Sequence, residues 1–379
     1  MKKFLLGIAM LLAAGSSFAQ TDFLSTEPAE FTIKAGEEKE VTVFINAEKR
    51  MKFDAINTVI QLPKGVEPVL LDTYEDWSDE LEDFVEVPVY VTPLNQLTNK
   101  NVSIYSSYVP ETESESGLNE LEILEFSMPQ VGFPGKDAVD HSTYFTESIF
   151  SFKVKASDKA YSGEPIKFID TNLNIRTSGT PAYFDDLVVD MQYRVEATIG
   201  ENGYATFSWP VPVDFTDFTG KARIATADAL KDGFVAREAI AKVPANTGII
   251  LEGDAGSCLL STLARGAEAD AATNNILIGT ADAPVVVDAA KKFYALAKNE
   301  KGVGFYVCEK GVEIPQYKAY YKADSSSGAD AFLFEETTGI NNVEAAAQNA
   351  DVYTISGVKV EKAAQKGIYI VNGKKVVVK

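Results

Sequence analysis

The stretch FTIKAGEEKEVTVFIN, residues 31–46, decides the fold class of this chain. Its apolar residues Val41, Val43 and Ile45 alternate with polar ones, which is the period of a strand with one buried face. Two further segments repeat this alternation: AINTVIQLPKGVE at residues 55–67 and IFSFKVKASDKAYSGEPIKFID at residues 149–170. Short strands joined by Gly, Pro, Asn and Asp, without a long helical period, predict an antiparallel β-sandwich.

These segments resemble the strands of cohesin-like domains. The resemblance rests on three features: Gly36 in the turn after the first strand, the sequence LPKGV at residues 62–66, and Phe152-Lys153-Val154 ahead of a Gly turn. It spans about residues 23–191, and we assign residues 20–195 to this domain. The resemblance implies a fold shared with several carbohydrate-binding modules. It leaves the role open, because one sandwich hosts many functions.

A second β domain is expected over residues 196–336. Its short strands and turns include GYATFSWP at residues 203–210, VPANTGIIL at residues 243–251, GVGFY at residues 302–306 and FLFEE at residues 332–336. These phrases resemble a module that recurs in exported Bacteroidales proteins, and that resemblance implies no particular activity. Two Ala-rich stretches, residues 264–272 and 283–292, are candidates for short helices.

The N-terminus has the three parts of a secretory signal peptide, residues 1–19. Lys2 and Lys3 supply positive charge, residues 4–14 are apolar, and Ser17-Phe18-Ala19 has the small-x-small pattern of a cleavage site. We therefore expect cleavage between Ala19 and Gln20. The apolar run is too short to be a permanent membrane span, and no other stretch of the mature chain approaches one. No Cys follows it, which argues against a lipoprotein.

The last 29 residues, 351–379, predict a small β module. VYTISGVKV is followed by KGIYIVNGKKVVVK, in which Asn372-Gly373 is a strong hairpin signal because both residues tolerate positive φ. The preceding stretch TTGINNVEAAAQNA, residues 337–350, is small and polar and predicts a linker. On pattern alone, the module is equally well an edge extension of the preceding domain.

This tail resembles the C-terminal sorting domain of type IX secretion cargo in the Bacteroidetes. The matching residues are Gly357, Gly367, Tyr369, Asn372, Gly373, Lys374 and Lys375. The resemblance implies export across the outer membrane by the secretion machinery. It also implies, in the usual case, removal of the tail and anchoring at the cell surface.

The charge of the chain limits its partners. It has 35 Lys and Arg against 55 Asp and Glu, a formal net charge of −20. Such a surface repels phosphate backbones and anionic lipids, so nucleic-acid and membrane-surface partners are not expected. The simplest role of this acidity is to keep an exported protein soluble.

No residue set in the sequence predicts an active site. His141 is the only histidine, and no G-x-S-x-G motif accompanies it. One His and two separated Cys cannot form the usual zinc sets, and the Gly-rich phosphate and dinucleotide motifs do not occur. We therefore expect no enzyme, no cofactor and no metal, although abundant acids leave a paired-carboxylate glycoside hydrolase as the least favoured alternative.

The two cysteines, Cys258 and Cys308, allow two interpretations. Outside the cytoplasm they can form a disulfide. Two buried free thiols are an equal alternative, because both residues lie beside apolar runs.

Aromatic residues of the first domain are the candidate ligand-binding residues: Trp77, Tyr90, Tyr105 and Tyr108. Aromatic rings stack on sugars or anchor protein partners, and their alternative role is packing in a core or an edge strand.

An acidic stretch surrounds one of these aromatic residues. DTYEDWSDELEDFVE, residues 72–86, carries eight acids, and its residues Trp77, Leu81 and Phe84 have the spacing of one face of a short helix. The stretch is either a calcium- or partner-binding insertion or a solvated amphipathic excursion. An EF-hand loop is excluded because its ligand pattern is absent.

Together these features predict a non-enzymatic, exported, all-β protein of the cell surface that binds a glycan or a protein. The alternative is a structural spacer or fimbria-like component without a ligand of its own. An extracellular polysaccharide hydrolase is the third possibility.

The tail generates the first testable prediction. Deletion of residues 351–379 is expected to leave the upstream domains folded, because their strands are complete before the linker begins. The truncated protein should accumulate in the periplasm instead of reaching the surface, as measured by cell fractionation together with the melting temperature. A truncated protein that still reaches the surface but melts early would contradict the sorting role and show that the tail pairs with an upstream edge.

Overall fold

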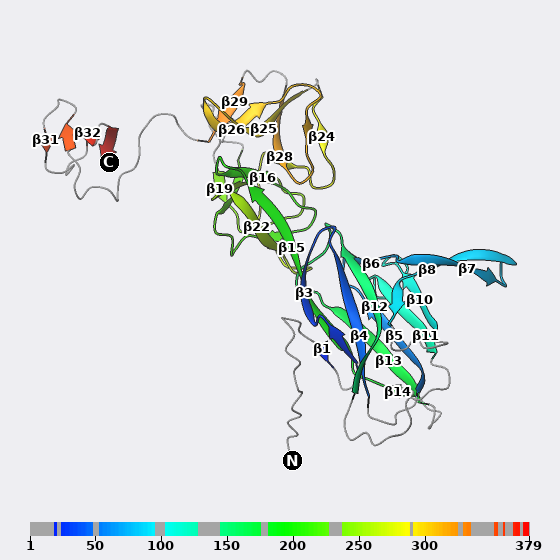
Figure 1. The fold of residues 1–379 in the computed structure, drawn as a ribbon. Helices are drawn as coiled ribbons and strands as arrows, with labels where there is room; N and C mark the ends of the chain where they lie inside the picture. Colours follow the sequence, from blue (N-terminus) through cyan, green and yellow to red (C-terminus); the bar gives the residue numbers. More distant parts are fainter. Residues whose placement is uncertain are drawn as a thin grey trace, which may run out of the picture.

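The computed structural model describes residues 19–20, 24–47, 53–94, 103–127, 145–175, 181–226, 237–288, 291–324, 329–334, 352–354, 359–360, 367–371 and 374–378. All regular elements within these ranges are β-strands, which confirms the all-β fold class (Figure 1). The described residues contain no helix that is long and apolar enough to cross a membrane. Residues 1–18 of the expected signal peptide, His141 and the expected linker lie outside the described ranges.

The first region of the chain is a sandwich of two sheets. One sheet has the order β1-β2-β4-β12-β6, with β9 also paired to β12. Its strands are β1 (Ala19–Gln20), β2 (Leu24–Glu27), β4 (Glu38–Ala47), β6 (Val66–Pro68), β9 (Val91–Pro93) and β12 (Phe145–Ala156). The expected cleavage site therefore falls within β1, which pairs with β2.

The facing sheet contains the order β10-β11-β5-β13-β15, with β14 on β13 and β3 parallel to β15. Its strands are β3 (Glu30–Lys34), β5 (Phe53–Gln61), β10 (Ser103–Val109), β11 (Glu120–Ser127), β13 (Ile166–Ile175), β14 (Pro181–Tyr183) and β15 (Leu187–Ile199). All of its other pairings are antiparallel.

The core of the sandwich is built from the alternating residues that the sequence displays. Val41 and Val43 of β4 and Phe152 of β12 are fully buried, as are Ile60 of β5 and Phe168 of β13 in the facing sheet. The rings of Phe152 and Phe168 meet edge to face with centroids 6.1 Å apart, which joins the two sheets. The period-2 pattern thus places one side of each strand in a shared apolar layer.

The turn at Gly65 explains why the LPKGV sequence has glycine at this position. Gly65 has φ of +76°, and a Cβ atom there would lie 2.5 Å from the backbone nitrogen of Ala160. Only glycine fits this position, because any side chain would collide with the neighbouring backbone.

Strand β15 is 13 residues long and continues from the sandwich into the next region. Its residues alternate between buried and exposed along the whole length. The first half pairs with β13 and β3, whereas Arg194 to Ile199 pair with β22 (Gly256–Thr262). The expected domain boundary at residue 195 therefore lies inside a continuous strand.

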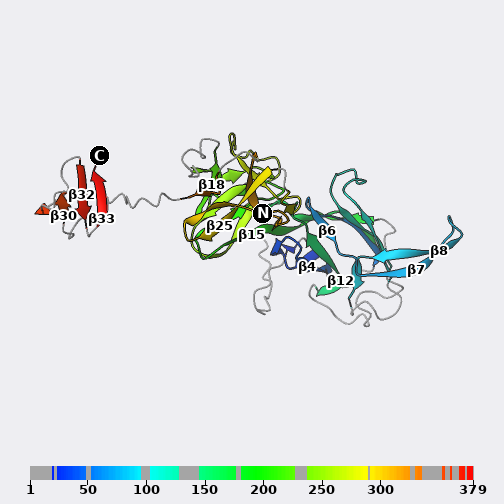
Figure 2. The ribbon, with the colours of Figure 1, turned by 90° about the horizontal axis from the view of Figure 1, so that it is seen from above.

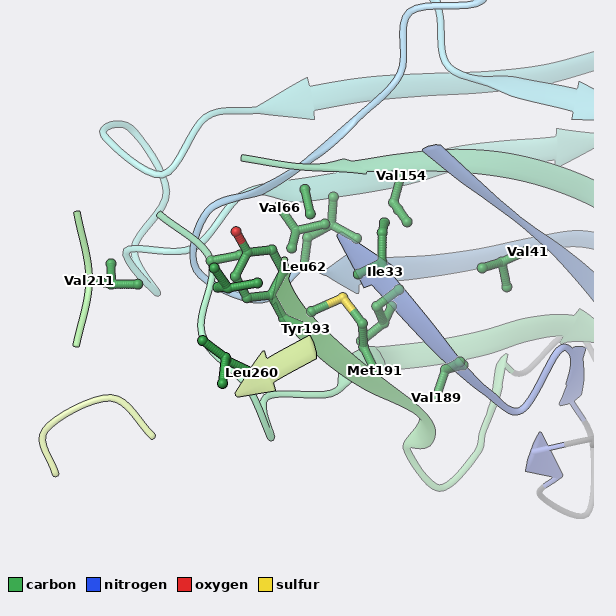
Figure 3. Close-up of a cluster of buried hydrophobic side chains, with 14 of the residues drawn as sticks. Ile33, Val41, Leu62, Val66, Val154, Val189, Met191, Tyr193, Val211 and Leu260 are labelled. Atoms are coloured by element: carbon green, nitrogen blue, oxygen red, sulfur yellow. The ribbon is translucent and has the colours of Figure 1, made fainter. Parts of the chain in front are cut away.

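Contacts of side chains reinforce this junction. The hydroxyl of Ser162, in the turn between β12 and β13, donates to the carbonyl oxygen of Tyr193 at 2.6 Å. The backbone N–H of Ser162 donates to the hydroxyl of Thr262 in β22 at 2.7 Å. Buried residues on both sides, such as Leu62, Tyr193 and Leu260, belong to a single apolar cluster (Figure 3). The sandwich and the region that follows it are thus packed on one core.

The region after β15 consists of short strands in several small sheets. β17 (Val213–Asp214) and β20 (Lys242–Val243) extend the β15–β22 sheet. A four-stranded sheet contains β16 (Tyr204–Phe207), β18 (Lys221–Ala225), β19 (Arg237–Ala239) and β21 (Ile249–Glu252). A five-stranded sheet contains β23 (Leu277–Gly279), β25 (Lys291–Asn299), β26 (Gly302–Val307), β28 (Ala319–Asp324) and β29 (Ala331–Leu333), and β24 (Val285–Val286) pairs with β27 (Glu313–Ile314).

The short helices considered for the two Ala-rich stretches are wrong. Residues 264–272 form turns and irregular backbone, while β24 and the start of β25 occupy the described part of residues 283–292. Alanine is the strongest helix former, but intrinsic propensity is small compared with tertiary interactions, and for residues 283–292 the strand pairing of β24 and β25 overrides it.

The C-terminal module is a four-stranded sheet of its own, in the order β31-β30-β32-β33. Its strands are β30 (Val352–Thr354), β31 (Lys359–Val360), β32 (Gly367–Val371) and β33 (Lys374–Val378). Val371 lies opposite Lys374, as expected for a hairpin with a two-residue connection. Gly357, Asn372 and Gly373 lie outside the described residues.

The junction generates a prediction about Tyr193. Its ring is fully buried, and its hydroxyl makes no hydrogen bond of ordinary geometry with the described residues, although the side chain of Trp209 interacts with it. Replacement by Phe is therefore expected to change the free energy of unfolding by no more than about 1 kcal/mol, because at most one weak hydrogen bond is lost. Replacement by Ala should cost about 3–5 kcal/mol through the cavity it leaves. Urea unfolding checks both values, and a Phe variant as unstable as the Ala variant would contradict this account.

Candidate interaction surface

The acidic stretch folds as a β-hairpin, so the expected short helix is wrong. Strand β7 (Asp72–Ser78) pairs antiparallel with β8 (Asp83–Val89), with Asp72 opposite Val89 and Ser78 opposite Asp83. The spacing of Trp77, Leu81 and Phe84 fits one face of a short helix and also fits a β-hairpin. In the hairpin, Trp77 lies directly opposite Phe84, and Leu81 lies in the connecting turn.

The sequence of β8 carries the pattern that favours a strand over the expected helix. Val85, Val87 and Val89 recur every second residue, which is the strand period, and β-branched side chains favour strands over helices. Valines and Tyr74 share one face of the hairpin, and the Trp77–Phe84 pair lies on the other. The valine alternation therefore favoured a strand, and it outweighed the helical spacing of Trp77, Leu81 and Phe84.

The hairpin extends away from the body of the sandwich, as Figures 1 and 2 both show. Its two strands form a separate sheet, and among the described residues they pair with each other and with no strand of the sandwich sheets. Its tip is thus free of the core that fixes the rest of the first region.

Three large apolar side chains are exposed at the tip of this hairpin. The exposed fraction is 51% for Trp77, 67% for Leu81 and 62% for Phe84. The rings of Trp77 and Phe84 meet edge to face at 77°, with centroids 5.4 Å apart. The indole N–H of Trp77 donates to Oδ1 of Asp79 at 3.0 Å, so its one polar group is already bonded within the hairpin. We call Trp77, Leu81 and Phe84 the apolar tip.

Acidic side chains surround the apolar tip. The hairpin contains no Lys or Arg, and its acids are Asp72, Glu75, Asp76, Asp79, Glu80, Glu82, Asp83 and Glu86, all of them exposed. None of them takes part in an ion pair between described residues. Glu75 and Glu86 lie directly opposite each other, an arrangement of like charges that destabilises a strand pair.

Two of the four candidate aromatic residues lie together, apart from Trp77. Tyr90 and Tyr108 are half-buried and meet edge to face with centroids 5.6 Å apart. The hydroxyl of Tyr108 donates to Oδ1 of Asn119 at 2.9 Å, and the amide of buried Asn119 donates to the carbonyl of Val66 at 2.7 Å. Burial raises the pKa of Tyr108. These contacts give the two tyrosines a role in packing.

The fourth candidate aromatic residue is Tyr105. Tyr105 belongs to β10, and its side chain is outside the described part of the molecule. Leu81 and Phe84 join Trp77 at the tip, although sequence reasoning did not count them as ligand-binding residues. The dense run of acids around these large apolar residues is the sequence signal that could have identified them. A helix or strand that buries such residues against a core does not need so many charged neighbours.

Cys258 and Cys308 are free thiols in the structure. Cys258 lies in β22 of the long sheet, while Cys308 follows β26 and packs against a different apolar cluster. Burial raises the pKa of both thiols, which makes them poor nucleophiles at neutral pH.

Two hollows lie elsewhere in the described part of the molecule. A cleft of ≈ 580 Å³ lies at the junction, where Asp158 accepts a hydrogen bond from the hydroxyl of Tyr317 at 3.0 Å and Lys34 pairs with Glu196 at 2.7 Å. A second hollow of ≈ 820 Å³ is lined by residues of β16, β25 and the turn before β28. The described residues contain no group of three His, Cys, Asp or Glu that could hold a metal ion.

No family model matches the chain, and no curated protein matches it. Three solved structures are similar to parts of the chain at low identity. A cohesin module from a Clostridium perfringens family 33 glycoside hydrolase has 8% identity and a TM-score of 0.24, covering 47% of this chain and 95% of that one.

The other two structures are pilus proteins. The major pilin subunit BcpA of Bacillus cereus has 8% identity and a TM-score of 0.24, covering 77% of this chain and 67% of that one. The full-length pilus protein RrgB of Streptococcus pneumoniae has 10% identity and a TM-score of 0.22, covering 90% of this chain and 44% of that one.

The electrostatics of the hairpin generate a prediction for fluorescence quenching. The chain has two Trp residues, and Trp209 is only 6% exposed. In a Trp209→Phe variant, Cs⁺ should quench Trp77 about twofold or more better than I⁻, because the surrounding carboxylates attract the cation and repel the anion. In a Trp77→Phe variant, both ions should quench weakly, because Trp209 is buried. Equal quenching of Trp77 by the two ions would contradict the negative potential assigned to the tip.

Proposed function

We propose that this protein is an exported, non-enzymatic binding module of the cell surface, and that the β7–β8 hairpin is its contact element. The observation that carries the proposal is the apolar tip: Trp77, Leu81 and Phe84 are more than half exposed on an element that projects from the fold. Large aromatic and aliphatic residues that anchor in a partner's pocket supply most of the binding energy of an interface.

The exposure of the tip has a cost that a purely structural hairpin would avoid. Water contact with three large apolar side chains is unfavourable and invites non-specific association. Burial of such a side chain contributes about 1.5–3 kcal/mol, and this contribution becomes available when a partner covers the tip. The surrounding carboxylates keep the free protein soluble in the meantime.

The rest of the molecule suits the presentation of such an element. The continuous strand β15 and the bonds of Ser162 fix the sandwich to the region that follows it. In Figure 1 the hairpin projects from the sandwich away from that region. Signal-peptide and sorting-tail patterns in the sequence support a location at the cell surface, where the hairpin would meet its partner.

A second candidate function is a structural spacer or fimbria-like component without a ligand. The observation that favours it is the stiff junction, because a shared strand resists bending between two regions. This alternative gives the apolar tip no role. Removal of the tip therefore separates the two functions.

The test is binding of the purified protein to intact cells of the source organism from which its gene has been deleted. Replacement of both Trp77 and Phe84 by Ala should weaken binding by at least about tenfold, which corresponds to about 1.4 kcal/mol. A Tyr183→Ala variant is the matched control, because Tyr183 is 74% exposed on β14 in another part of the sandwich.

A second variant keeps the test informative if the Trp77→Ala/Phe84→Ala variant misfolds. Excision of residues 72–89 with a short Gly-Ser bridge removes the two-stranded sheet, the bond from the Leu71 N–H to the Val89 carbonyl and the packing of β8 beside β10, so the melting temperature should fall by no more than about 4 °C. Cell binding that is unaffected by both changes would overturn the binding role of the hairpin and leave the spacer function.

A further inference from the structure

We infer that the partner of the apolar tip is a protein whose surface has an apolar pocket rimmed by Lys and Arg, and not a glycan. This inference rests on the proposed function and identifies the chemistry of the partner. Its first support is the shape of the tip. The tip is carried on a projecting two-stranded hairpin, so it can enter a pocket but cannot enclose a ligand (Figure 2).

The orientation of the rings disfavours a sugar. A sugar ring stacks on a flat aromatic face, but Trp77 and Phe84 stand at 77° to each other and do not form a shared platform. A protein that binds a sugar must also offer well-placed hydrogen-bond donors and acceptors to the sugar hydroxyls. The hairpin side chains offer mainly carboxylate acceptors, and the indole N–H is already bonded to Asp79.

The charges select the partner further. Eight exposed carboxylates without a single Lys or Arg give the hairpin a strongly negative field. Such a field attracts a basic surface and repels acidic or sulfated glycans and nucleic acid. Arg and Lys side chains at the rim of a pocket would bond these carboxylates while the pocket buries the apolar tip.

The opposed pair Glu75 and Glu86 points to the same partner. These side chains lie directly across the hairpin from each other, next to Trp77 and Phe84, with no cation of the described residues between them. Their repulsion is a cost in the free protein. A guanidinium group of the partner placed between the two carboxylates would remove the repulsion and gain two charge-assisted hydrogen bonds.

The first arm of the test measures cell binding against ionic strength for the full chain. A double variant, Glu75→Gln with Glu86→Gln, keeps the shape of the hairpin and removes two charges. It should bind about threefold or more weakly at low salt and respond less to added salt than the parent does. Its matched control is Glu113→Gln with Glu115→Gln, which removes two exposed charges from the acidic loop of residues 110–117 and should bind like the parent.

The second arm identifies the class of the partner. A photo-reactive benzoylphenylalanine replaces Phe84 in the full chain, the protein is cross-linked on intact cells, and the purified product is digested with trypsin and analysed by mass spectrometry. The expected result is peptides of a second protein joined to the peptide that carries residue 84, together with loss of the product in the Glu75→Gln/Glu86→Gln background. The same reagent at Tyr183 should give no such product.

Two outcomes overturn the inference. One is a cross-linked product whose added mass is a glycan, and the other is binding that does not change with salt or with the loss of Glu75 and Glu86. Either result, combined with loss of binding in the Trp77→Ala/Phe84→Ala variant, would leave the proposed function intact and remove only the basic protein partner. Failure of the tip variant to affect binding would remove both.

Discussion

The pairing of β15 is the interaction on which the rest of the structure depends. Its 13 residues keep strict alternation, so one face stays buried while the strand passes from the partners β13 and β3 to the partner β22. A slip of one residue would move every buried side chain of β15 to solvent. Residues before and after position 195 therefore share one core, which includes Tyr193.

The hairpin β7–β8 shows the opposite design. It shares no sheet with the sandwich, and its eight carboxylates would be costly to bury in any core. Separation from the core leaves its sequence free of packing constraints, which is what a contact surface requires. The stiff body and the free hairpin are thus complementary: the shared strand fixes the orientation of the sandwich, and the sandwich carries the tip into solvent.

Much of the fold was accessible from the sequence because period-2 alternation and turn residues are local signals. Val41, Phe152 and Phe168 are buried as the pattern predicts, and the strands on either side of Asn372-Gly373 pair in the register of a two-residue hairpin. The candidate site was accessible only in part. Trp77 was recognised, but the same three apolar residues fit a helix and a hairpin, and only pairing across the turn distinguishes them.

The sequence by itself determined the all-β class, the strand faces, the absence of recognisable catalytic motifs and the acidity of residues 72–86, because each depends on residue type and short spacing. Tertiary structure alone decided that β15 serves two regions, that Tyr90 and Tyr108 pack with Asn119, that the cysteines stay apart, and that the acidic stretch is a projecting hairpin. These properties depend on which distant strands pair, and pairing is set by the free energy of burying whole faces together, which no local pattern contains.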